Sequence, residues 1–501
     1  MQYILGLDIG TTHCKAVAVT AQGELLHQAT AGYPTIQSLP GQSEQDAELI
    51  YGSVLEVLQY SLVSLRQHEL KAVCFSAAMH SIMAVDDAGH PLTNLFTWAD
   101  TRGNEYALTI RNWNGSHDLY ARTGTPVHPM SPLCKLAWMK KVMPDIVAKA
   151  AKFISIKEYV FFKLTGTYIV DYSIASATGL FDIQQKKWDA TALGLAGINA
   201  GQLSEPVPVS YAETNLQQAC RQLLGITGDI PFIVGGSDGC LANIGSGAIL
   251  PGEAALTIGT SGAIRVTVEK SRTDQQQRLF NYILTDNLFV TGGAISNGGA
   301  AMKWFAENFL QHPFTAATDI DWMVQLAHEA PEGAGGLIFL PYLSGERAPF
   351  WDASARAVFM GLQTAHGRQH LARAVVEGIS FALYQVMQAV EANNGNISVV
   401  YASGAFITSP LWLQMMADVM DKTIIVAGTA DASAMGAAFL GMHTIGWIKN
   451  LSEIKQLVTQ EASFSPDAAK HRTYQRYFDV YQDLYPKLKD NFRQLEKLQQ
   501  P

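Results

Sequence analysis

The sequence predicts an α/β protein with two domains around a central cleft, and three observations support this fold class. Apolar segments with strand character alternate with segments of helical apolar spacing, which is the order found in layered α/β folds. A strand, a glycine-containing turn and a second strand occur once in each half of the chain. The 501 residues exceed what one hydrophobic core normally covers, so two domains are expected.

The first turn follows residues 3–7, an apolar segment that we expect to be a buried strand with Asp8 at its carboxyl end. Gly10 lets the backbone approach an anion closely, while the two threonines after it supply hydroxyl and amide donors. A second strand follows and pairs with the first as a hairpin. These residue types predict a phosphate-binding loop in residues 8–12.

The second turn repeats this plan near the middle of the chain. Residues 255–258 form the entering strand, residues 263–268 form the leaving strand, and the turn between them contributes Gly259, Thr260 and Ser261. Either turn alone also occurs in hairpins that bind nothing. Because the plan is used twice, we expect two half-sites that close on one nucleotide.

Between the two turns, the apolar segment 231–235 leads into glycines and a single carboxylate, Asp238. One interpretation is that Asp238 caps a helix that begins near Gly239. The other is that Asp238 is a general base, which accepts the proton of a hydroxyl group during phosphoryl transfer. Glycines and a proline in residues 245–252 predict a hinge just beyond it, which would place Asp238 at the cleft.

Composition restricts the ligands and the location of the protein. A net charge of −9 without a basic tract argues against nucleic-acid and anionic-membrane partners, so small metabolites are the expected ligands. Five cysteines without Cys-x-x-Cys spacing predict neither a zinc site nor disulfides, and they favour the cytoplasm. The start of the chain has no targeting pattern, and its longest apolar stretch, residues 434–442, is far shorter than the roughly 20 residues that span a bilayer.

Apolar spacing and capping residues predict several further elements. Helices are expected at residues 43–65, 371–391, 411–420 and 471–500, the last of them on the surface. Strands are expected at residues 73–77, 81–85 and 399–402. Arg347 is expected to order a loop beside the cleft through Glu346 or another nearby acid.

Two long segments resemble the signatures of the FGGY family of carbohydrate kinases. Residues 130–139 match the first signature, except that Val142 replaces its final polar residue, and residues 357–377 match the second throughout. The resemblance covers essentially the whole chain and implies the actin-like ATPase fold of two ribonuclease-H-like domains. Residues 1–245 would hold the sugar, the first phosphate loop and the catalytic aspartate, and residues 246–501 the second loop and adenosine.

The resemblance also implies a reaction and its cofactors. Members of the family transfer the γ-phosphate of MgATP to a sugar hydroxyl, and Asp238 would be the catalytic base. By the same resemblance, the first phosphate loop would consist of Asp8, Gly10, Thr11, Thr12 and Lys15, and the second of Gly259, Thr260 and Ser261. Mg²⁺ would lie near Asp8 and Asp238, bound through water molecules. Adenosine contacts are expected from Gly404 and Ala405, although the bulky Phe406 after them departs from the family pattern. A homodimer is also expected by resemblance.

The acceptor is expected to bind in the first domain, where aromatic, acidic and basic side chains occur close together. Such mixtures suit polyols, whose hydroxyls need donors and acceptors while their C–H faces stack on rings. The candidate contacts are Met79, His80, Trp98, Asp100, Arg102 and His128. Asp100 and Arg102 have a second interpretation as a surface ion pair, and each histidine has one as a neutral hydrogen-bonding residue.

The identity of the acceptor is inferred from the resemblance within the family. Three segments resemble the gluconokinase branch more than the xylulokinase branch: residues 123–132, 153–159 and 171–177. Gluconate carries a carboxylate, which His80, Arg102 and His128 would balance. The sequence thus predicts transfer to a terminal hydroxyl of D-gluconate, giving 6-phosphogluconate. The alternatives are xylulose or another pentulose or polyol as acceptor, and an actin-like ATPase without a sugar acceptor.

Overall fold

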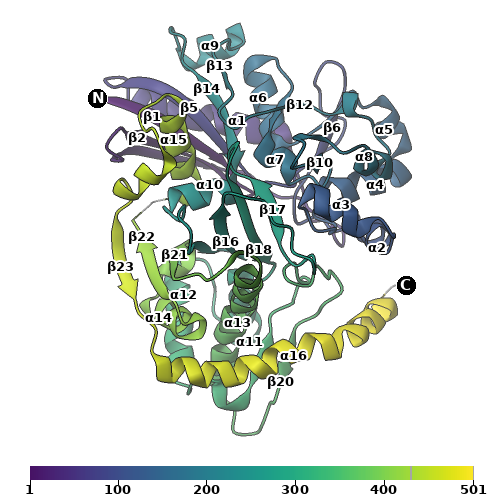
Figure 1. The fold of residues 1–501 in the computed structure, drawn as a ribbon, viewed down its shortest axis with the longest axis vertical. Helices are drawn as coiled ribbons and strands as arrows, with labels where there is room; N and C mark the ends of the chain where they lie inside the picture. The colour runs from purple at the N-terminus through teal and green to yellow at the C-terminus, as the bar shows by residue number, and fades with distance from the viewer. Residues whose placement is uncertain (429–430, 500–501) are drawn as a thin grey trace.

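The computed structural model describes residues 1–428 and 431–499, whose strands form two main sheets, one in each half of the chain (Figure 1). The strand order of the first sheet is β13 (Ala212–Glu213), β14 (Phe232–Ser237), β5 (Glu69–Ala77), β1 (Gln2–Ile9), β2 (His13–Thr20) and β3 (Leu25–Gly32). The order of the second is β17 (Phe280–Ile283), β18 (Phe289–Ile295), β16 (Gly262–Val268), β15 (Glu253–Ile258), β21 (Val399–Ser403), β22 (Thr423–Ala427) and β23 (Gln460–Phe464).

The middle of the first sheet positions the candidate catalytic residues. β5 pairs in parallel with both β1 and β14, so the carboxyl ends of three strands meet at one edge. Asp8 lies on β1 opposite Ser76 of β5, and Asp238 directly follows β14. β1 and β14 are buried along almost their whole length, as expected for strands that are covered on both faces.

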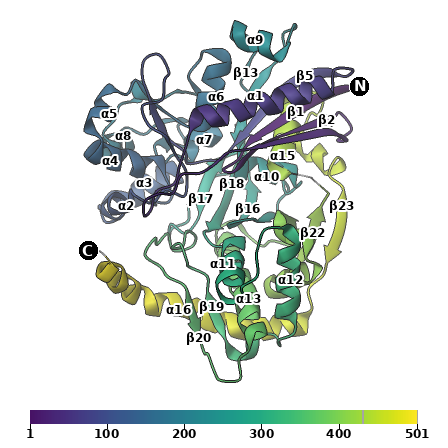
Figure 2. The same ribbon diagram turned by 180° about the vertical axis from the view of Figure 1, so that it is seen from behind.

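Helices cover both faces of the first sheet (Figure 2). One face carries α1 (Ala47–Ser64), α6 (Ile156–Thr165) and α9 (Gln218–Leu224), and the other carries α15 (Ala432–Thr444). α1 begins behind Asp46, whose carboxylate accepts hydrogen bonds from two amides of the first turn. α6 begins with a capping box formed by Ser155 and Glu158.

A region of short helices and two-stranded ribbons lies beside the first sheet and carries the predicted acceptor contacts. Its helices are α2 (Asn104–Arg111), α3 (Ser116–Thr123), α4 (Pro132–Val142), α5 (Pro144–Lys149), α7 (Tyr172–Ser176) and α8 (Ala190–Ala196). Its ribbons are β4 (Glu44–Gln45) with β7 (Leu95–Phe96), β6 (Met83–Val85) with β8 (Lys152–Ile154), β9 (Ile169–Asp171) with β12 (Glu205–Val207), and β10 (Phe181–Asp182) with β11 (Lys187–Trp188).

The second domain surrounds its sheet with longer helices. These are α11 (Gly299–Phe309), α12 (Ala317–His328), α13 (Arg368–Asn394), α14 (Pro410–Met420) and α16 (Ala468–Gln499), with β19 (Ile338–Leu340) paired to β20 (Val358–Met360). α16 runs along the far side of this domain (Figure 1). The helix expected at 471–500 is found, but the expectation that it lies entirely on the surface is wrong. One of its faces is buried, because Tyr474, Phe478 and Tyr481 pack near Phe381. Residue 500 lies outside the described residues.

The helices α10 (Asp238–Gly245) and α15 cross between the two sheets, and glycines let them touch. A Cβ atom on Gly436 of α15 would overlap the carbonyl group of Leu241 in α10. A Cβ atom on Gly245 would overlap the carbonyl group of Ala432 in the same way. The largest apolar cluster runs through these helices from one sheet to the other, so the core continues across the domain boundary.

The other predicted elements are found with shifted ends. The helix expected at 43–65 begins only at Ala47, because Glu44 and Gln45 pair with β7 as a strand. The helix expected at 371–391 extends further at both ends, as α13. In chain order, β14 is the last strand of the first sheet and β15 is the first strand of the second. However, α15, which comes later in the chain, packs on the first sheet. The division at residue 245 therefore stays a prediction. None of the described helices is long and apolar enough to cross a bilayer.

Candidate active site

A cleft of ≈ 2040 Å³ opens between the two domains, and both domains contribute to its wall. Its volume exceeds that of a site for one small molecule, about 300–1,000 Å³, so a nucleotide and an acceptor fit together. The predicted site residues in the wall are Thr11, Thr12, Lys15, Met79, His80, Trp98, Arg102, His128, Asp238, Gly259, Thr260, Ser261, Gly404 and Ala405. Asp8, Gly10 and Asp100 are not part of this wall.

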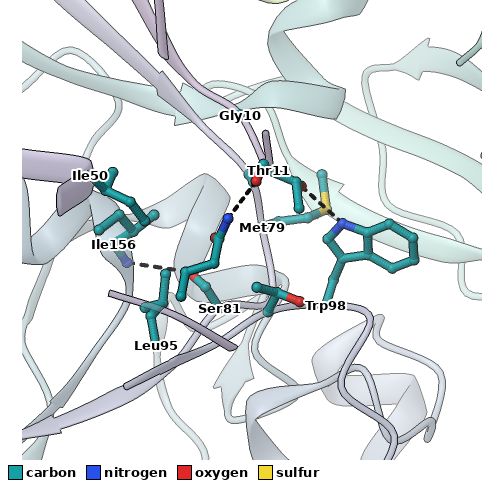
Figure 3. A pocket seen from close by; sticks show the side chains of 11 residues that line it. Gly10, Thr11, Ile50, Met79, Ser81, Leu95, Trp98 and Ile156 are labelled. Atoms are coloured by element: carbon teal, nitrogen blue, oxygen red, sulfur yellow. Dashed lines mark hydrogen bonds between the residues drawn. The ribbon is translucent and has the colours of Figure 1, made fainter. Parts of the chain in front are cut away.

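The first loop is held in place by side chains of the first domain. The indole nitrogen of Trp98 donates to the hydroxyl of Thr11 at 3.0 Å, and the amide of Gln45 donates to the Thr11 carbonyl at 2.5 Å (Figure 3). The Tyr33 hydroxyl donates to the Gly10 carbonyl at 2.5 Å. A void of ≈ 10 Å³ lies between the loop and the side chains of Gln45 and Trp98, and it has room for about one water molecule. These contacts fix the backbone of the loop at the edge of the cleft.

The second loop is tied to the beginning of α11. The amides of Gly298 and Ala300 donate to the Thr260 carbonyl, each at 3.0 Å, and the amide of Gly299 donates to the Gly259 carbonyl at 2.7 Å. Since both loops line the same cleft, the fold brings together the two turns that are half the chain apart.

Asp238 is the first residue of α10, and its carboxylate accepts a hydrogen bond from the amide of Gly239 at 2.6 Å. The N-cap of α10 is Ser237, so the interpretation of Asp238 as the capping residue is wrong, and its side chain lines the cleft as a base requires. Burial raises the pKa of Asp238, although the Gly239 amide and the charge of Arg265 oppose the shift. A carboxylate with a raised pKa is a better proton acceptor near neutral pH.

Asp8 lies close to other negative charges at the end of β1. The carboxylate is 8 % exposed and accepts a hydrogen bond from the Ser76 hydroxyl at 2.5 Å. Burial raises the pKa of Asp8 well above its usual range, and the charges of Asp431 and Asp238 raise it further. Lys15 offsets part of this charge through an ion pair with Asp431 at 2.8 Å. Such carboxylates fit Mg²⁺, whose ligands are carboxylate oxygens and water.

The predicted adenosine contact Gly404 occupies a position that excludes other residues. Its φ angle is +94°, and a Cβ atom there would lie 2.5 Å from the Ile258 carbonyl oxygen. Ser403, Gly404 and Ala405 all line the cleft. Phe406, the bulky departure from the family pattern, is fully buried, so its bulk fills the core.

Both candidate histidines are buried and neutral. His80 has a φ angle of +68°, with Nδ1 2.7 Å from the Ala177 carbonyl and Nε2 3.4 Å from the hydroxyl of Tyr282 in the second domain. Burial lowers the pKa of His80 to about 3. Burial also lowers the pKa of His128, whose Nδ1 accepts from the Met130 amide at 3.2 Å. The expected positive charge of these two side chains is therefore absent near neutral pH.

Arg102 is neutralised by two carboxylates. Its Nη2 lies 2.6 Å from Asp100 and 2.5 Å from Glu44, and its Cζ lies 5.0 Å and 4.7 Å from the ring centres of Phe96 and Trp138, which contact each other edge to face. Asp100 is 1 % exposed, so this cluster is a buried network and not a surface ion pair. Two carboxylates thus share the charge of Arg102, and its contact with a sugar acid stays a prediction.

Two buried arginines in the cleft wall were not predicted as site residues. Arg265 follows the second loop on β16, with Nε 3.3 Å from the Asn243 side chain and Nη2 2.9 Å from the Thr257 hydroxyl. The sequence does carry a signal for Arg265, because it is a charged residue in a strand whose neighbours are apolar. Arg347 lies between β19 and β20, and its guanidinium contacts the Ile295 carbonyl instead of Glu346. The sequence placed Arg347 in a loop beside the cleft, but the partner of its guanidinium depends on tertiary contacts.

Comparison with known proteins gives the class that this fold and cleft define, a two-domain carbohydrate kinase. The model of the N-terminal domain of FGGY carbohydrate kinases matches residues 3–245, and the model of the C-terminal domain matches residues 254–445. The chain belongs to the FGGY family of carbohydrate kinases.

The similar proteins include both gluconokinases and xylulose kinases. A gluconokinase from Bacillus subtilis is 36% identical over 99% of this chain and 98% of its own, and a xylulose kinase from the same species is 30% identical over 98% of both. Two crystal structures from Lactobacillus acidophilus, one of a gluconate kinase and one of a ligand-bound xylulose kinase, are each 33% identical with a TM-score of 0.92. Both cover 99% of this chain, with 99% and 100% of their own lengths matched. These similarities confirm the predicted fold class and the family.

Proposed function

We propose that the protein is a gluconokinase, which transfers the γ-phosphate of MgATP to the terminal hydroxyl of D-gluconate and forms 6-phosphogluconate. The observation that carries this proposal is the full-length similarity to a gluconokinase, which at 36% exceeds the 30% to a xylulose kinase of the same species. The buried cations Arg265 and Arg347 in the cleft suit the negative charge of the phosphates as well as that of a sugar acid.

Asp238 is the proposed general base. It stands at the carboxyl end of β14, where residues of the first domain and the second loop line the same cleft. The proton of the acceptor hydroxyl moves to an Asp238 carboxylate oxygen as the hydroxyl oxygen forms its bond to the γ-phosphorus. The bond between the γ-phosphorus and the oxygen that bridges to the β-phosphorus breaks, and its electron pair leaves with ADP. The raised pKa of Asp238 favours this proton transfer.

The donor nucleotide is proposed to lie between the two loops. Amide and hydroxyl groups of Thr11, Thr12, Thr260 and Ser261 would bind its phosphates, with the adenosine at Gly404 and Ala405. Asp8 and Asp238 would hold Mg²⁺ through water; burial raises the pKa of both carboxyl groups, and the charge of Asp238 adds to the shift of Asp8. When bound, the ion would neutralise charge on the phosphate oxygens.

A ketose is the alternative acceptor, because the xylulose kinase structure is as similar to this chain as the gluconate kinase structure is. An actin-like ATPase without an acceptor has no support from the family assignment, which is to carbohydrate kinases. The homodimer and the cytoplasmic location stay predictions. The five cysteines are free thiols, as the cytoplasm would keep them.

The acceptor is tested by coupled ADP release with MgATP and gluconate, xylulose, ribulose, glycerol or no acceptor. A kcat/KM for gluconate that exceeds every other value by at least about 100-fold, roughly 2.7 kcal/mol, supports the gluconokinase. Preference for a ketose would replace gluconate while leaving the proposed role of Asp238 intact. Turnover that does not depend on an acceptor would argue against a sugar kinase mechanism.

A further inference from the structure

The first signature segment contains a buried lysine that the proposed mechanism does not use. Lys135 lies in the first half of α4 and is 1 % exposed. Within residues 1–428 and 431–499, no carboxylate oxygen lies within 4.0 Å of its Nζ, and the nearby Asp100 is paired with Arg102. Burial lowers the pKa of Lys135 to about 7, although the charge of Asp100 opposes the shift. Burying an ammonium group without a carboxylate is costly, so other contacts have to offset that cost.

The ammonium group of Lys135 joins two segments that are far apart in the sequence. Its Nζ donates to the His80 carbonyl at 2.8 Å and to the Met130 carbonyl at 2.6 Å. His80 lies between β5 and β6, and Met130 lies shortly before α4. Both of these residues line the cleft, whereas Lys135 is not part of its wall. Lys135 therefore acts on the cleft through the backbone of these two segments.

The backbone of His80 has a conformation that depends on its surroundings. Its φ angle of +68° lies in the left-handed region, which residues other than glycine rarely adopt. Such a conformation persists only where the surrounding contacts determine it. The ring is held by the Ala177 carbonyl, 2.7 Å from Nδ1, and by the Tyr282 hydroxyl, 3.4 Å from Nε2. The bond from Lys135 fixes the main-chain carbonyl of the same residue.

The second segment is the turn that leads into α4. The amide and the hydroxyl of Ser131 donate to the His128 carbonyl at 3.0 and 3.1 Å. The amide of Met130 donates to Nδ1 of His128 at 3.2 Å, so the orientation of this ring depends on the turn. Because Lys135 binds the Met130 carbonyl in this turn, it connects the positions of the two cleft histidines, His80 and His128.

We infer that Lys135 is a positioning residue, which holds the segments of His80 and His128 at the spacing that the acceptor requires. The inference rests on the proposed function, because it places the acceptor beside these two histidines. It concerns the shape of the pocket and not its charge, so it applies to a sugar acid and to a ketose alike. Without Lys135, the buried carbonyls of His80 and Met130 lose this donor, and the spacing of the two segments is no longer fixed.

The test compares Lys135→Met with the wild type by coupled ADP release, with gluconate and with xylulose as acceptors. Methionine keeps the apolar body of the side chain but has no donor. KM is measured for the acceptor at saturating MgATP and for MgATP at saturating acceptor. We expect the acceptor KM to rise by about 30-fold while the KM for MgATP changes by less than about 3-fold, because only the acceptor segments lose their donor. An unchanged acceptor KM, or an equal rise in both KM values, would overturn the inference.

Lys135→Gln tests the same role if the methionine variant does not fold. The side-chain amide of glutamine has two N–H donors and no charge, so it can still bind both carbonyls. We expect it to keep the acceptor KM within about 5-fold of the wild-type value, again with little change in the KM for MgATP. A glutamine variant as impaired toward the acceptor as a folded methionine variant would contradict the role of the two hydrogen bonds.

Lys141→Met is the matched control. Lys141 lies on the same helix, but its side chain is exposed. This change should leave both KM values as they are in the wild type, and a rise in acceptor KM like that of Lys135→Met would overturn the inference. A wild type that uses xylulose but not gluconate would refute the proposed acceptor alone, because the comparison on xylulose still decides the role of Lys135. A wild type without acceptor-dependent turnover would refute both.

Discussion

The Asp238 carboxylate contacts its own helix and also faces the cleft. One oxygen accepts from the amide of Gly239 in the first turn of α10, and the side chain still lines the cleft. The helix contact fixes its orientation, while burial raises its pKa. Orientation and basicity are the two properties that a general base needs, and both come from its place between β14 and α10.

Replacement of Asp238 by asparagine should remove the base while keeping the shape of the site. We expect kcat to fall by about 1,000-fold, because general base catalysis typically contributes on the order of 100- to 10,000-fold. ATP binding, measured by calorimetry, should change by less than about 3-fold. Asp87→Asn on the exposed surface is the control and should behave as the wild type. An Asp238→Asn enzyme with wild-type kcat would disprove the base assignment.

In the protein without ligands, ionisation of Asp8 is unfavourable, because the carboxyl group is buried near other acidic groups. Its folded pKa is raised above the unfolded value, so the folded protein binds this proton more tightly than the unfolded chain does. The stabilisation from that proton is fully present below the unfolded pKa of about 4 and is lost as pH rises toward the folded pKa. Ionised Asp8 therefore destabilises the free protein at the upper end of this range.

Asp8→Asn should stabilise the free protein at pH 7 while impairing turnover. Asparagine can still accept from the Ser76 hydroxyl, and it removes the buried charge. We expect a gain of about 1 kcal/mol, seen as a rise in Tm of roughly 1–3 °C by calorimetry. The gain should disappear near pH 4, where the wild-type carboxyl is protonated. A lower Tm at pH 7 would show that the carboxylate is a net stabilising group.

The residues that sequence reasoning found are those whose chemistry is local. Examples are Gly10, Thr11 and Gly259, which lie in short turns after apolar strands. Their residue types are enough to predict both the turn and its contact with an anion. The ion pair of Arg102 with Glu44 could not be predicted in this way, because Glu44 is far away in the sequence. The position of Arg347 depends on the approach of the second domain to Trp98, which no single segment encodes.

At the scale of elements, α10 and α15 join the two domains through a close crossing. Gly245 and Gly436 permit this approach, because a side chain on either would overlap a carbonyl of the partner helix. The N-terminus of each helix carries a carboxylate of the cleft, Asp238 on α10 and Asp431 as the N-cap of α15. The distance between these charges is thus set by how closely the helices pack.

Gly436→Ala should destabilise the protein although alanine favours helices. The added Cβ would overlap the Leu241 carbonyl, which forces the helices apart at an expected cost of about 1–3 kcal/mol. The matched control is Gly52→Ala in α1, where a Cβ meets nothing within 4 Å and a gain of about 0.5–1 kcal/mol is expected. Both are compared by urea unfolding. Equal effects of the two substitutions would show that the crossing is not tightly packed.

Periodicity predicted the existence of the long elements better than their ends. The helix expected at 43–65 loses its first residues to a β-bridge with β7, a contact between distant segments. The tail was taken for a surface helix because its composition is polar. However, Tyr474, Phe478 and Tyr481 share one helical face, and this spacing was the available signal for a buried side.

At the scale of the molecule, the two sheets face one cleft and the chain passes between them at β14 to β15. Gly247 and Gly252 have positive φ angles in the predicted hinge at 245–252, so this connection has the glycines that a turn requires. The apolar core through α10 and α15 connects the domains beside it. Rotation of one domain on the other would therefore occur about this shared core.

We expect the cleft to close when nucleotide and acceptor are both bound, because an open cleft would let water take the phosphoryl group. Small-angle scattering should show a smaller radius of gyration with a nonhydrolysable nucleotide plus gluconate than with either ligand alone. The protein without ligands is the control. An unchanged radius in all four samples would contradict closure.

The most direct test of the central claim is to identify the product of MgATP and ¹³C-labelled gluconate by NMR spectroscopy. The account predicts that the wild type forms one phosphorylated product, with phosphorus coupled to the terminal carbon remote from the carboxylate. An unchanged gluconate spectrum, under conditions in which the same enzyme phosphorylates xylulose, would contradict it.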